Sequence, residues 1–301
     1  MTGAPGESGS GGSRVGGRTT EDLGIDPPPR QRYPVRLGTA LRELSAGREL
    51  LLTFAERDLR VRYKQTILGA FWAVLQPFLL MVIFSVVFGR IARVGSEGVP
   101  YPVFAYSALV PWGFFSAAVT YGTTCLVVNG AIVRKIYLPR EVFPLSSVLS
   151  SAADFATSAL ILLLMLLGYG FFPTMAWLSV VPLLLALTLF AVASTLLVSA
   201  VTVYFRDSRF VVPTILQLVL YATPIAYPIG KGLAALPEGM RPLYPYLNPL
   251  VPILDGFRRA LVHGQWPRWG QLGFSAALGL ALLTLAYRWY KRLDASFPDV
   301  I

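Results

Sequence analysis

Few residues of this 301-residue chain carry side chains suited to catalysis or metal binding. Cys125 is the single cysteine and His263 the single histidine, so no internal disulfide and no zinc or iron site built from His and Cys can form. A Ser-His-Asp arrangement would have to recruit His263, and no Gly-x-Ser-x-Gly motif accompanies it. Glu56 and Asp58 are interleaved with arginines that would neutralise them, which disfavours a magnesium site. The sequence therefore predicts a non-catalytic chain.

The chain also lacks the usual nucleotide-binding motif. The single Gly-Lys pair, Gly230 and Lys231, has Ile225 where the first glycine of the phosphate-binding loop G-x-x-x-x-G-K-[ST] should stand. We therefore expect no phosphate-cradling loop and no cofactor in this chain.

Asp154 is an ionisable residue inside a long apolar stretch. It follows Val142 by 12 residues, which is about 18 Å along a helix that rises 1.5 Å per residue. A carboxylate at such a depth is usually paired, inward-facing or functional. We consider two roles for it: a hydrogen bond to Gln76, Thr157 or Ser151, or a polar contact that lines a transport path.

The composition indicates a membrane protein. Hydrophobic residues make up 54% of the chain and charged residues 14%, whereas soluble domains have about 25% charged residues. The net charge of +10 does not indicate nucleic acid, because the basic residues flank apolar runs and form no patch beside aromatic RNA-binding motifs. Membrane lipids are the expected surroundings.

Six apolar segments are each close to the roughly 20 residues needed to cross a hydrocarbon core of about 30 Å. We expect them at about 69–89, 103–128, 142–169, 177–203, 211–229 and 270–290. The predicted fold class is an all-α integral membrane protein with six transmembrane helices. Its membrane domain covers 66–295 and is followed by a short C-terminus, 296–301.

Two different segments precede the first span. Residues 1–37 are rich in Gly, Ser and Pro and contain no apolar run, so we expect a disordered tail. Residues 38–65 alternate apolar and basic positions in a way that is typical of an amphipathic helix at the membrane interface. A solvated helix whose charges serve only topology is the alternative.

The distribution of basic residues predicts the orientation. With both termini in the cytoplasm, 19 of the 26 Lys and Arg residues lie in cytoplasmic segments and seven in outer ones. Because cytoplasmic loops are enriched in Lys and Arg, we expect both termini inside.

Two connections between spans have distinctive sequences. Ile132–Pro144 (IVRKIYLPREVFP) is a charged, proline-bounded elbow, which we expect in the cytoplasm in contact with a partner. Residues 230–268 contain six prolines, which exclude one long helix, and apolar residues at helical spacing. We expect one or two short helices there, which re-enter the outer leaflet or cover an exit.

Aromatic residues are dense in the first span. Those near span ends are typical of the interfacial belt of membrane proteins. Phe71, Trp72 and Phe78 could instead face a conduit and stack on sugar rings, and Phe71 and Phe78 share a helix face.

Four stretches together resemble the permease subunit of type-2 ABC exporters that move polysaccharide or polyol phosphate, as in O-antigen and teichoic acid export. They are Arg60–Pro77 (RVRYKQTILGAFWAVLQP), the elbow sequence KIYLPREVFPL, Tyr204–Pro228 with its Arg-Asp pair and prolines, and Leu247–Arg258 with Asn-Pro-Leu. The resemblance covers about residues 40–295. Each stretch alone is a weak signal, whereas their combination is specific.

The resemblance implies a homodimer in the cell membrane with a conduit between its two copies. It also implies two copies of a separate nucleotide-binding ATPase subunit, which would hold the ATP and Mg²⁺. In such exporters the elbow sits in a cleft of the ATPase. The candidate coupling residues are Arg134, Lys135, Tyr137, Pro139, Arg140 and Glu141.

The resemblance further implies a lipid-linked glycan as substrate. Its lipid head would enter near Arg57, Arg60, Arg62 and Lys64, although these residues could also serve topology alone. Candidate conduit residues are Phe71, Trp72, Phe78 and Asp154, and candidate external-gate residues are Asn248, Pro249, Phe257 and Arg258.

Two other functions remain open. A type-2 exporter of a drug or small lipid would share the fold and the coupling but have a narrower conduit. An integral-membrane enzyme acting on polyprenyl-linked sugars would need a carboxylate or histidine site at the membrane surface, and none is found in the sequence.

Overall fold

The computed structural model of this chain describes residues 48–64, 66, 69–135, 138–234, 237–294 and 297. All regular elements in these ranges are helices, which confirms the predicted all-α class. Several predictions fall outside the described residues: the tail 1–37, residues 38–47 of the surface helix, Tyr137, and the C-terminus 296–301 apart from Phe297.

Five helical segments of the described residues are long and apolar enough to cross a membrane. They are α3 (Trp72–Phe84) with the π-helical η3 (Ser85–Ile91), α4 (Tyr101–Val128), α6 (Val142–Gly168), η4 (Met175–Ser179) with α7 (Val180–Tyr204), and α12 (Trp269–Asp294). They agree to within a few residues with five of the six predicted spans.

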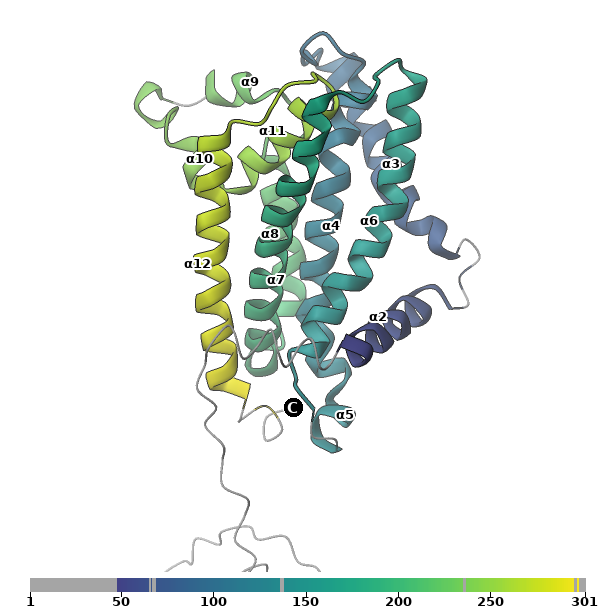
Figure 1. The fold of residues 1–301 in the computed structure, drawn as a ribbon, viewed down its shortest axis with the longest axis vertical. Coiled ribbons are helices and arrows are strands. Elements are labelled where there is room, and N and C mark those ends of the chain that lie inside the picture. Colours follow the sequence, from purple (N-terminus) through teal and green to yellow (C-terminus); the bar gives the residue numbers. More distant parts are fainter. Residues whose placement is uncertain are drawn as a thin grey trace, which may run out of the picture. The chain divides into compact units, whose positions relative to one another are not determined.

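Figure 1 shows these helices running alongside one another as a bundle. At one end lie α2 (Arg48–Tyr63), which covers residues predicted as a surface helix, and the short α5 (Gly130–Lys135). At the opposite end lie α9 (Ile229–Ala234), α10 (Tyr244–Leu247) and α11 (Leu250–Leu261). With the 3₁₀ turn η5 (Glu238–Met240), the proline-rich segment 230–268 thus forms short helices as predicted, but three α-helices and not the expected one or two.

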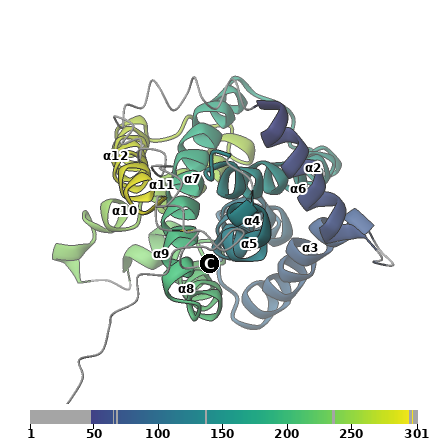
Figure 2. The same ribbon diagram turned by 90° about the horizontal axis from the view of Figure 1, so that it is seen from below.

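α4 is the central helix of the bundle. It is apolar on all sides, a pattern typical of a helix that is surrounded by others. The four consecutive residues Val103, Phe104, Ala105 and Tyr106 have no exposed surface. In Figure 2, α4 lies among α3, α6, α7 and α8 (Ser208–Ala222). The core of the protein is therefore built around this helix.

The predicted fifth span, 211–229, is longer than the helix found there. α8 has 15 residues, or about 22 Å at 1.5 Å per residue. It ends because Thr223 precedes Pro224 and is extended, with φ −94° and ψ 141°. The chain then turns toward α9 at the same end of the bundle.

Gly122 permits the close approach of α4 to α7. A Cβ atom at this position would lie 2.0 Å from Cγ2 of Thr195, whose side chain is itself buried. A methyl group can be accommodated there only if Thr195 or one of the two helices shifts.

We predict that Gly122→Ala destabilises the protein. The clash should cost about 1–3 kcal/mol, which exceeds the gain of up to about 1 kcal/mol that Ala brings to a helix. The control is Gly113→Ala in the same helix, where an added Cβ meets no atom within 4 Å. Thermal unfolding in detergent should give a lower Tm for Gly122→Ala and an unchanged or higher Tm for Gly113→Ala; equal Tm values would contradict the packing argument.

Candidate functional site

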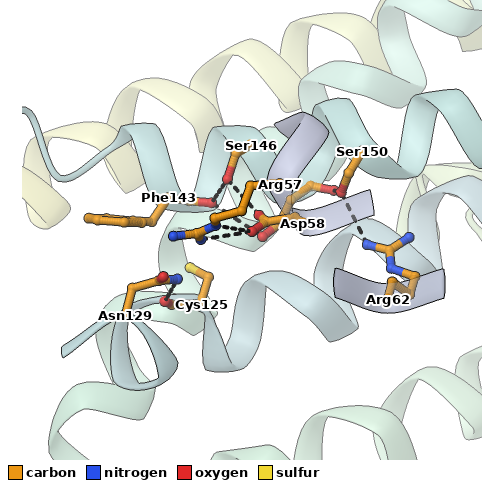
Figure 3. Close-up of polar contacts among 9 residues, drawn as sticks. Arg57, Asp58, Arg62, Cys125, Asn129, Phe143, Ser146 and Ser150 are labelled. Carbon is orange, nitrogen blue, oxygen red and sulfur yellow. Dashed lines mark hydrogen bonds and ion pairs between the residues drawn. The ribbon is translucent and has the colours of Figure 1, made fainter. Parts of the chain in front are cut away.

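A polar stripe on α6 faces α2. Ser146, Ser150 and Asp154 recur every four residues, so they share one face of the helix. The Ser146 hydroxyl shares its single proton between Oδ2 of Asp58, at 3.0 Å, and a carbonyl of its own helix. Nη2 of Arg62 donates to Oγ of Ser150 at 3.1 Å. Figure 3 shows Asp58 and Arg62 directed toward these serines. The stripe is therefore the docking face for α2.

The serines of α6 also bond to their own helix. Ser146 and Ser147 donate to the carbonyl of Phe143, at 2.8 and 3.2 Å, and Ser150 and Ser151 donate to the carbonyl of Ser147, at 3.1 and 2.8 Å. Each hydroxyl thus has an acceptor within α6 that does not depend on α2.

Asp154 is paired with α2. Its carboxylate forms an ion pair with Arg62 and accepts a hydrogen bond of 2.7 Å from the Tyr63 hydroxyl. The guanidinium of Arg62 also lies 3.5 Å from the ring centroid of Tyr121 on α4. Burial and the bond to Asp154 raise the pKa of Tyr63 well above its ordinary value, so the phenol stays a donor at neutral pH.

The partners proposed for Asp154 from the sequence, Gln76, Thr157 and Ser151, are not the ones found. Thr157 instead donates to the carbonyl of Ala153. A guanidinium stabilises a partly buried carboxylate more than an amide or hydroxyl does, which explains why Asp154 pairs with Arg62. Tyr63 and Tyr121 were missed because periodicity within one helix does not identify the helix that packs against it.

A cavity of about 610 Å³ adjoins this ion pair. Its walls combine polar and aromatic side chains from α2, α3, α4, α6 and α8, including Arg62, Tyr63, Trp72, Gln76, Trp112, Tyr121, Asp154, Gln217 and Tyr221. Pockets of about 300–1,000 Å³ with a few convergent polar groups are typical binding sites for small molecules. Such a wall can hold an uncharged polar ring by stacking and hydrogen bonds.

The predicted conduit residues fall into two groups. Trp72 and Asp154 line the cavity. Phe71 and Phe78 are not among its lining residues, and 52% and 40% of their surfaces are exposed. Both phenyl rings thus lie on the outside of the single chain.

The four basic residues proposed to meet a lipid head group lie on α2 and just beyond it. Arg62 reaches the cavity. Arg57 pairs with Asp58 at 2.8 Å and stacks on Phe54, whereas Arg60 pairs with Glu56 on the exposed surface. Lys64 is exposed in the turn that follows. Only one of these cations is therefore turned toward the cavity.

The elbow residues lie at the α5 end of the bundle. Arg134 and Lys135 at the end of α5 are exposed, as is Pro139. Arg140 and Glu141 turn inward and form ion pairs with Asp294 and Lys291 of α12. The elbow thus has an exposed basic face and a face bound to α12.

The predicted gate residues lie at the opposite end of the bundle, where Asn248 and Pro249 are half-buried and Phe257 and Arg258 are buried. Asn248 donates to the Thr223 hydroxyl at 3.0 Å and accepts from the Leu250 amide, and Pro249 caps the start of α11. Phe257 is 2% exposed. These contacts fix α11 against the end of α8.

Arg258 binds backbone carbonyls of the irregular segment that follows α8 and of α4. Its guanidinium donates to the carbonyls of Pro224 at 3.1 Å, Ile225 at 3.0 Å and Phe104 at 3.4 Å. A guanidinium stays protonated at neutral pH, so Arg258 brings a full set of donors to these carbonyls. Unpaired carbonyls in an apolar environment are costly, so this arginine stabilises the broken segment.

Metal ligation has no support in the described part of the chain, where no group of three or more His, Cys, Asp or Glu side chains could hold an ion.

Comparison with known proteins identifies the family. Residues 49–262 match the family described as ABC-2 type transporter. The chain belongs to the ABC-2 type transporter family. The resemblance seen in the sequence is thereby confirmed at the level of the family, and with five apolar membrane-length helices the chain is a multi-pass membrane protein.

The ABC-2 chain is similar along most of its length to permeases of glycan exporters. It is 30% identical to the O-antigen export system permease protein RfbA of Myxococcus xanthus, over 87% of this chain and 98% of that protein. It is 27% identical to RfbA of Klebsiella pneumoniae, over 84% and 95%, and 23% identical to the polysialic acid transport protein KpsM of Escherichia coli, over 78% and 90%.

We predict strong coupling between Arg62 and Asp154 in this ABC-2 chain. Arg62→Gln and Asp154→Asn should each destabilise the fold by about 2–3 kcal/mol, somewhat below the roughly 3–5 kcal/mol for a fully buried pair. The double variant should lose clearly less than the sum of the two, because no unpaired charge remains. Unfolding in detergent would measure the cycle, and additive losses would contradict the pairing.

The matched control is the Arg60 and Glu56 pair on the same helix. Both side chains are largely exposed, so their pairing should contribute close to nothing.

Proposed function

We propose that this ABC-2 chain is the permease subunit of an ATP-driven exporter of a lipid-linked polysaccharide. The observation that carries the proposal is the cavity whose walls combine aromatic rings with amide, hydroxyl and charged groups. Such a lining suits sugars, which offer hydroxyls for hydrogen bonds and flat faces for stacking. The similarity to O-antigen and polysialic acid export permeases supports the same substrate class.

The assembly we propose contains two copies of this chain and two copies of an ATPase subunit in the cell membrane. ATP and Mg²⁺ bind to the ATPase, and this chain carries no cofactor. The exposed rings of Phe71 and Phe78 suit contact with the second copy, so that the conduit lies between the two. The exposed Arg134, Lys135 and Pro139 form the described part of the surface for the ATPase.

The topology we propose has six spans with both termini in the cytoplasm. The fifth span consists of α8 and the irregular segment after it. Irregular backbone at membrane depth is tolerated where protein groups satisfy it. The bonds from Arg258 to the carbonyls of Pro224 and Ile225 support this reading. α9, α10 and α11 then form the re-entrant external gate.

In this mechanism the lipid head group approaches along α2. Arg57, Arg60 and Lys64 attract its phosphates, and Arg62 stands at the cavity beside Asp154. Sugar rings then stack on Trp72 and Trp112. Movement of the elbow by the ATPase opens the conduit, and Asn248, Pro249, Phe257 and Arg258 hold the gate helix that closes it.

We predict ATP-dependent glycan transport by the reconstituted complex. Inverted vesicles containing this chain and its ATPase should carry added polyprenyl-diphosphate-linked polysaccharide into the lumen, where periodate outside the vesicles cannot reach it. This chain alone should hydrolyse no ATP. Transport of a hydrophobic dye or short lipid without protection of the glycan would instead favour the small-substrate exporter.

Within that assay, Trp72→Ala should lower transport about 2–10-fold, the equivalent of losing an aromatic contact of about 0.5–1.5 kcal/mol. Trp289→Ala in α12 is the matched control, because that residue is not among those lining the cavity.

Cysteine labelling tests the topology. In a Cys125→Ser background, Lys135→Cys should react with an impermeant maleimide from the cytoplasmic side, and Met175→Cys only from the outside. Both positions are exposed, so access depends on the side of the membrane alone. Labelling of both from the same side would overturn the proposed orientation.

A further inference from the structure

Two crossed ion pairs join the elbow to the end of α12. Nη1 of Arg140 lies 3.1 Å from Oδ1 of Asp294 and also donates to its backbone carbonyl, while Nζ of Lys291 lies 2.7 Å from Oε1 of Glu141. Lys291 and Asp294 are three residues apart and therefore share one face of α12. Arg140 and Glu141, which are adjacent and opposite in charge, thus each meet a residue of opposite charge on α12.

This contact is buried on the elbow side. Glu141 is 1% exposed, and its second oxygen, Oε2, has no hydrogen-bond partner among the described residues. Lys291 therefore provides the compensation that a buried carboxylate needs. Breaking the contact while the elbow moves would leave this charge without its partner, so separation of the two elements is costly.

The rest of α12 packs mainly against α7 and α11, and it is distant in sequence from the elbow. Near its end, Tyr290 lies edge-on against Phe297 with ring centroids 5.4 Å apart, and Phe297 also contacts Tyr204 of α7. The charged contact consequently connects the elbow to an end of the last helix that also packs, through Phe297, against α7.

We propose that Lys291 and Asp294 are positioning residues that make α12 move together with the elbow when the ATPase acts on it. This inference rests on the proposed function, because it assumes that the elbow receives the force. It assigns the two faces of the elbow different tasks: Arg134 and Lys135 face the ATPase, whereas Arg140 and Glu141 hold the last helix.

The test uses the assembled complex and measures ATP hydrolysis and glycan protection per complex. Lys291→Met and Asp294→Asn should reduce transport at least about fivefold while hydrolysis stays within about twofold of the unmodified complex. Arg292→Ala, an exposed neighbour on the same helix, should change neither. Unchanged transport in the first two variants, or hydrolysis that falls in proportion to transport, would overturn the proposal.

Rescue provides the second readout. Glu141→Lys alone should uncouple the complex, and combining it with Lys291→Glu should restore transport to at least about half, because the swapped charges can pair again. A double variant no better than the worse single one would also overturn the proposal.

Failure of the proposed function is seen separately. A complex of unmodified chains that protects no glycan refutes that function before any variant is made. If Arg134→Ala with Lys135→Ala leaves hydrolysis unchanged, the elbow does not contact the ATPase, whatever Lys291 and Asp294 do.

Discussion

A charge inside an apolar helix bundle is stable only when another group compensates it, and this constraint organises the protein. α2 is held to α6 by Arg62 and Asp154, and the elbow is held to α12 by Arg140, Glu141 and their partners. At the opposite end Arg258 compensates backbone carbonyls instead of a carboxylate. Each polar contact lies where two elements meet that are far apart in the sequence.

The fifth apolar segment shows how such compensation permits an irregular backbone. Pro224 ends α8 early and leaves carbonyls that the helix would have satisfied. Arg258 of α11 donates to the carbonyls of Pro224 and Ile225, and its guanidinium carbon lies 3.7 Å from the ring centroid of Phe104. α11 is thereby fixed at the place where α8 stops, so the break and the short helices belong to one structural unit.

The sequence predicted the helical class and five of the membrane-length helices, because hydropathy depends on local composition that the bilayer thickness sets. The predicted fifth span extended too far, to residue 229, because the apolar composition continues past Pro224 whereas α8 ends at Ala222. The sequence also identified Asp154 as a residue that needs compensation. It did not identify Arg62, which lies 92 positions away, because pairing between helices is decided by packing and not by the period of either helix.

Some of the missed contacts had a signal in the sequence. The four-residue spacing of Ser146, Ser150 and Asp154 marks a polar face on an otherwise apolar helix. The neighbours Arg140 and Glu141 are complementary to Lys291 and Asp294, although that pattern has meaning only once both segments are known to lie at the same end. The proposed roles of these residues in coupling and binding remain predictions.

The serines of α6 have a consequence for how firmly α2 is held. Because each hydroxyl already has a backbone acceptor one turn away, lifting α2 off α6 would strand none of them. Losing α2 would therefore cost these serines little. The two helices are instead held together by the Phe54 and Phe143 rings, whose centroids are 5.1 Å apart, and by the Arg62–Asp154 pair, because separation there would leave a carboxylate without its partner.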